Sequence, residues 1–81
     1  MSEELRNMME YRSVVGTLSN GDNEDILNYA RKNIDSALYN VKRTTPGNVS
    51  HTLADIRSGL AAITACLDML EENVNKKGAN T

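Results

Sequence analysis

The sequence predicts an all-α protein in which a helical hairpin follows an N-terminal helix and the three helices assemble into a helical bundle. Three observations lead to this prediction. Apolar residues recur at helical spacing along three segments, and short polar breaks containing Gly or Pro separate those segments. The chain has three Tyr but no Trp and no Phe, so its core must use aliphatic side chains, which suit packed helices better than a sheet.

The first helix is expected at about residues 3–18. Ser19, Asn20 and Gly21 then end it, and Gly21 suits the left-handed conformation that often follows a helix terminus. The apolar residues of this helix form a single stripe, made of Leu5, Met8, Tyr11, Val15 and Leu18.

The second helix is expected at about residues 22–43, with Asp22 or Asn23 as its N-cap. Pro46 lies in the break that follows, which is only about five residues long, so the second and third helices should be antiparallel neighbours. The apolar stripe of the second helix alternates large residues with Ala and consists of Leu27, Ala30, Ile34, Ala37 and Val41, widened by Ile26 and Leu38.

The third helix is expected at about residues 48–75, and residues 76–81 should form a frayed tail. It carries an unbroken heptad seam, and in a parallel coiled coil Leu at a with Ile at d favours assemblies larger than dimers. The residues of this seam, expected at an oligomer interface or in the core, are Val49, Leu53, Ile56, Leu60, Ile63, Leu67, Leu70 and Val74.

The middle of the third helix has too little polar surface for an isolated zipper. No charged residue occurs from Ser58 to Leu67, and Gly59, Ala62 and Cys66 are small residues suited to close packing by a neighbour. The sequence therefore predicts a helix with neighbours on at least two sides, in a homodimer or homotetramer. A monomeric three-helix bundle is the alternative.

Candidate catalytic and metal-binding groups are sparse. His51 is the only His, and Asp55 on the same helical side is its one possible partner. Cys66 has no basic neighbour within one turn, so we expect a buried, unreactive thiol. The sequence predicts no catalytic residue, no metal site and no cofactor.

Two local resemblances add alternatives. Residues 54–63 resemble the phosphoacceptor helix of sensor histidine kinases, with Ala54 at the phosphoacceptor position and Gly59 in place of the usual Pro. This resemblance implies a docking mimic or an inhibitor of a kinase. Residues 46–60 resemble the recognition helix of helix-turn-helix DNA-binding domains, which implies that the major groove is contacted by Ser50, His51, Thr52 and Arg57.

Charge and composition favour a protein partner. The net charge of −2 gives no bias towards nucleic acid or anionic membrane. The polar N-terminus lacks the apolar segment of a signal peptide and the lone Cys suits a reducing compartment, so we expect a soluble, cytoplasmic protein. The predicted function is a small non-enzymatic interaction module, an adaptor, inhibitor or chaperone-like regulator, that binds itself and another protein. DNA-binding transcriptional regulation is the alternative; membrane binding and a small-molecule substrate are not expected.

Overall fold

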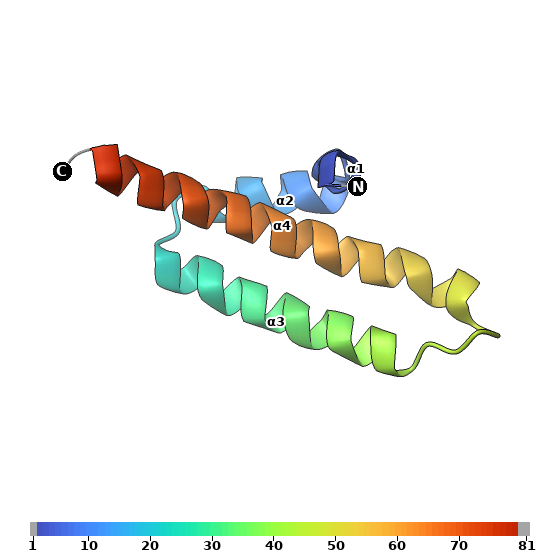
Figure 1. Ribbon diagram of the computed structural model, residues 1–81. Helices are drawn as coiled ribbons and strands as arrows, with labels where there is room; N and C mark the ends of the chain where they lie inside the picture. Colours follow the sequence, from blue (N-terminus) through green and yellow to red (C-terminus); the bar gives the residue numbers. More distant parts are fainter. Residues whose placement is uncertain (1, 80–81) are drawn as a thin grey trace.

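The computed structural model describes residues 2–79 and is an all-α helical bundle (Figure 1). Its helices are α1 (Ser2–Arg6), α2 (Met9–Leu18), α3 (Asn23–Lys42) and α4 (Val49–Ala79). α3 and α4 form an antiparallel hairpin, and α1 and α2 pack against α4 (Figure 1). The fold class predicted from the sequence is confirmed.

The predicted N-terminal helix is divided into α1 and α2 at Asn7 and Met8. The Asn7 N–H still bonds to the carbonyls of Glu3 and Glu4, but Met8 is extended, with φ −74° and ψ 150°. Met8 makes no side-chain cap to α2. Neither Gly nor Pro marks this break, so it depends on the tertiary contacts described below.

The turn between α2 and α3 differs from the expectation at Gly21. No glycine in the described part of the chain has a positive φ. Instead, the Gly21 N–H bonds to the Leu18 carbonyl at 2.9 Å, and an added Cβ would lie only 3.3 Å from that carbonyl oxygen. A Gly is favoured here by lack of space, and the expected left-handed conformation is not adopted. The predicted cap of α3 is confirmed, because the Asp22 side chain accepts a hydrogen bond from the Asp25 N–H at 2.9 Å.

The connection between α3 and α4 is closed by Asn48. Its side-chain oxygen accepts from the Thr45 N–H at 2.7 Å, and its amide nitrogen donates to the Arg43 carbonyl at 3.1 Å. α4 begins at Val49 and continues to Ala79, so the helix extends beyond residue 75 into the segment predicted to fray. Residues 80–81 of that segment lie outside the described residues.

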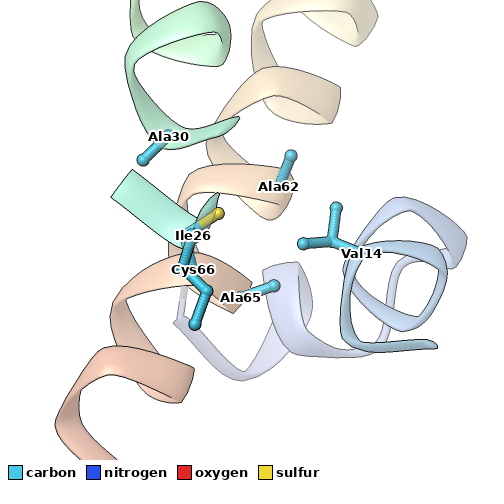
Figure 2. Close-up of a cluster of buried hydrophobic side chains, with 6 residues drawn as sticks. All are labelled: Val14, Ile26, Ala30, Ala62, Ala65 and Cys66. Atoms are coloured by element: carbon cyan, nitrogen blue, oxygen red, sulfur yellow. The ribbon is translucent and has the colours of Figure 1, made fainter. Parts of the chain in front are cut away.

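The core lies where α2, α3 and α4 meet (Figure 2). Ile26 is completely buried there and is the largest aliphatic side chain to be so. α4 contributes only small residues to this cluster, which allows α3 and α2 to approach it closely. The buried cluster consists of Val14, Ile26, Ala30, Ala62, Ala65 and Cys66, with Tyr11, Val15, Leu18, Met69 and Leu70 packed around it.

Candidate interaction surface

The heptad seam of α4 is largely exposed. Leu70 packs against the core, and Ile56 and Ile63 are half-buried, but the remaining five seam residues keep 40% to 62% of their surface accessible. The exposed members of the seam are Val49, Leu53, Leu60, Leu67 and Val74.

α3 carries a second exposed apolar stripe. Its large side chains point away from the core, while Ile26 and Ala30 fill it. The exposed residues are Leu27, Ile34, Leu38 and Val41, which keep 39% to 53% of their surface accessible.

Helical geometry places the α4 seam on the side of the hairpin opposite α2. Each residue advances about 100° around a helix. Ala65 lies in the cluster with Val14 of α2, and Leu60 and Leu67 lie about half a turn around α4 from it.

The α3 stripe faces the same way. Tyr29 and Asn33 line a shared cavity with Val14, so that edge of α3 faces α2. Ile34 and Leu38 lie about 140° and 180° around α3 from Tyr29. The two stripes therefore form one continuous surface, which we call the apolar face: Leu27, Ile34, Leu38 and Val41 of α3 with the seam residues of α4.

A small cavity opens along the α4 edge of the apolar face. It has a volume of about 190 Å³ and lies between α1 and α4. Leu5 and Met8 line one side, and the seam residues Leu53, Ile56 and Leu60 line the other. The break at Met8 thus lets the N-terminal segment fold against α4.

A polar cluster fixes α1 and α2 against α4. Arg6 donates to both carboxylate oxygens of Asp68, at 2.8 and 2.9 Å, and the Tyr11 hydroxyl donates to the same carboxylate at 2.6 Å. The hydrogen bonds from Arg6 hold the pKa of Asp68 below its usual range, and the bond to Asp68 raises the pKa of Tyr11. Because one carboxylate bonds to both segments, it holds them in place against α4.

Small residues of α4 lie at the contact with α3. A Cβ added to Gly59 would lie 3.5 Å from the Ala37 Cβ, which is ordinary van der Waals contact. Ala62 and Cys66 are buried in the core, and burial raises the pKa of the Cys66 thiol. Thr52, which the DNA-binding resemblance placed in the major groove, is instead buried on this contact and shares a 2.9 Å hydrogen bond with Thr44.

The residues of the DNA-binding alternative lie near the start of α4. Ser50 and His51 are exposed, and Arg57 is 3.9 Å from the Glu4 carboxylate. α3 and α4 run alongside each other in antiparallel directions (Figure 1), whereas the helices of a helix-turn-helix cross at about 90–120°. The arrangement of α3 and α4 therefore differs from that of a helix-turn-helix.

Within residues 2–79, no group of three or more His, Cys, Asp or Glu side chains is arranged to hold a metal ion. None of the described helices is both long enough and apolar enough to cross a membrane. Comparison of the chain with known protein families, curated proteins and solved structures found no match.

Proposed function

We propose that this chain is a small non-enzymatic interaction module that self-associates through the apolar face. The observation that carries the proposal is the position of the large side chains. In α4 the core takes mainly Ala and Cys, while Leu60 and Leu67 stay exposed, as Ile34 and Leu38 of α3 do. Leaving several large aliphatic residues together in water is costly, and a partner that covers them recovers the free energy of burial.

The surface area supports a partner of substantial size. The chain exposes 5783 Å², whereas a compact monomer of its mass would expose about 4,800 Å². The excess of about 1,000 Å² is comparable to the roughly 800 Å² that each partner buries in a standard protein interface. The radius of gyration of 14.2 Å also exceeds the value of about 11.7 Å expected for a compact domain of this length.

A second hairpin would complete a four-helix bundle. Two antiparallel helices with apolar residues on one side cover only half of such a core, and an identical pair supplies the other half. Within this proposal the surfaces that remain exposed, which are α2 and the polar sides of α3 and α4, bind a further protein partner. The protein would act there as an adaptor, an inhibitor or a chaperone-like regulator.

Size-exclusion chromatography with light scattering tests the proposal. We expect the wild-type chain to have at least twice its monomer mass of 8.9 kDa. The double variant Leu60→Asp/Leu67→Asp should elute as a monomer and keep its helical circular dichroism, because both side chains are on the surface of the single chain.

The matched control is Ser13→Asp/Ser36→Asp, which adds the same charge at two exposed serines away from the apolar face. We expect this control to assemble like the wild type. A wild-type chain that stays monomeric at high micromolar concentration, or a Leu60→Asp/Leu67→Asp variant that still assembles, would refute the proposal.

A further inference from the structure

The spacing of the residues on the apolar face, and of the charges beside it, is nearly unchanged when the direction of the helices is reversed. We propose that a second copy of this chain docks antiparallel on this face, across a two-fold axis that crosses the helices at the level of Ile34 and Ala62. This inference rests on the proposed self-association and specifies its geometry.

The α4 seam has the symmetry that such an axis requires. Its residues alternate four and three apart from Val49 to Val74, so the pattern is unchanged when the helix is reversed. The centre of the pattern lies between Ala61 and Ala62. When a second copy is reversed about this centre, Leu60 of one copy lies beside Ile63 of the other, and Val49 lies beside Val74. Every seam residue therefore meets another seam residue.

The charges on α3 have the same symmetry. Glu24, Arg31, Asp35 and Lys42 are all exposed and lie within a sector of about 40° on the outer edge of the apolar face. Their positions are symmetric about Asn33. Reversal of a second α3 places each Glu24 opposite Lys42 and each Arg31 opposite Asp35, so every one of these charges meets an opposite charge.

The two centres lie at one level of the hairpin. Gly59 packs against Ala37, and the Asn73 amide donates to the Asn23 side chain at 2.8 Å near the other end. This register puts Ile34 level with Ala62. One two-fold axis can therefore serve α3 and α4 together, as an isologous interface requires.

The cavity beside α1 accepts a side chain in this arrangement. Leu67 is among the most exposed seam residues, and reversal about Ala61 and Ala62 places it midway between Leu53 and Leu60 of the other copy. Those two leucines, with Ile56, line the apolar cavity of about 190 Å³. Insertion of a Leu into such a gap is the knobs-into-holes packing of antiparallel helices.

Two hairpins can also stack face to face about a two-fold axis that runs parallel to the helices. In that arrangement α3 of one copy stacks on α4 of the other. In the register of the hairpin, Glu24 is then level with Glu71 and Glu72, and Glu71 lies on the outer edge of α4. Like charges facing each other at an interface disfavour association. The charge pattern therefore selects the arrangement in which each helix pairs with its own copy.

A charge-swap series measured by sedimentation equilibrium tests this geometry. Glu24→Lys and Lys42→Glu each create like-charged pairs at two symmetric positions, and we expect each to raise the dimer Kd by about 5- to 30-fold. The double variant Glu24→Lys/Lys42→Glu restores opposite pairs, and we expect its Kd to return to within about threefold of wild type. Lys32→Glu is the control, because it makes the same charge change on a part of α3 facing away from the interface.

Cysteine cross-linking gives a second, independent readout. In a Cys66→Ala background, Ile34→Cys lies beside its own copy at the two-fold axis and should form an interchain disulfide on mild oxidation. Leu27→Cys, two turns away on the same stripe, should not. A wild-type chain that does not dimerise would overturn the proposed self-association, and this inference with it. A dimer without charge-swap rescue and without the Ile34→Cys disulfide would overturn the antiparallel docking alone.

Discussion

Two isoleucines on α3 provide a direct test of which residues form the core. Ile26 is completely buried among Val14 and Cys66, whereas Ile34, on the same helix, is 49% exposed on the apolar face. The substitutions Ile26→Ala and Ile34→Ala remove the same atoms from the same helix. Any difference between them therefore reports on burial and not on helix propensity.

The expected cost of Ile26→Ala is about 3–4 kcal/mol. The lost carbon atoms account for roughly 2.4 kcal/mol of transfer free energy, and the cavity left in a closed core adds the rest. A domain of this size has a total stability of roughly 4–12 kcal/mol, so the variant should lose about a quarter of it or more. Ile34→Ala in the single chain should cost only about 1 kcal/mol, because half of the side chain is already in water and no closed cavity forms.

Urea denaturation followed by circular dichroism at several protein concentrations measures both costs. The loss for Ile26→Ala should be similar at every concentration. The loss for Ile34→Ala should grow with concentration as assembly buries the apolar face. Equal losses for the two variants at the lowest concentration would refute the assignment of the core.

Three further predictions follow from individual contacts. Gly59→Ala should raise the free energy of unfolding by about 0.5–1 kcal/mol in urea titrations, because the added Cβ meets Ala37 at an ordinary van der Waals distance and Ala favours the helix. A loss of stability would show that the two helices are closer than described. Thr52→Val should cost about 1 kcal/mol in the same assay by removing a buried hydroxyl from its hydrogen bonds, and no loss would contradict that role. The pKa of Asp68 is lowered by Arg6, so its stabilising contribution is present above its unfolded-state pKa of about 3.9 and is lost as the pH falls through the lower folded value. Asp68→Asn should therefore flatten the acid side of a plot of stability against pH, and an unchanged acid limb would count against the pair.

The local signals in the sequence predicted most of the secondary structure. The hairpin connection around Pro46 and the Asp22 cap are present where the sequence places them, because turn and cap preferences depend on neighbouring residues. The break at Met8 could not be predicted in the same way. It has no local breaker and depends on contacts with α4, a helix more than forty residues further along the chain.

The candidate surface was predicted only in part. The seam was expected at an oligomer interface or in the core, and within one chain only Leu70 among its members packs against the core cluster. The small residues Ala62 and Cys66 were expected to pack closely, and they form the α4 side of the core. The apolar stripe of α3 was predicted from helical spacing, and its members Ile34 and Leu38 remain half-exposed in the structure.

The sequence by itself determined that α3 and α4 are long antiparallel helices and that α4 has two faces able to pack, one of small residues and one of large residues. Helical periodicity and a short connection are local properties, so a single sequence reveals them. Only the tertiary structure decided that the small face turns inward. That choice depends on how closely α2 and α3 approach α4, and the small side chains of Ala62, Ala65 and Cys66 allow this approach. The large face is left on the outside, where we propose that a second copy of the chain binds.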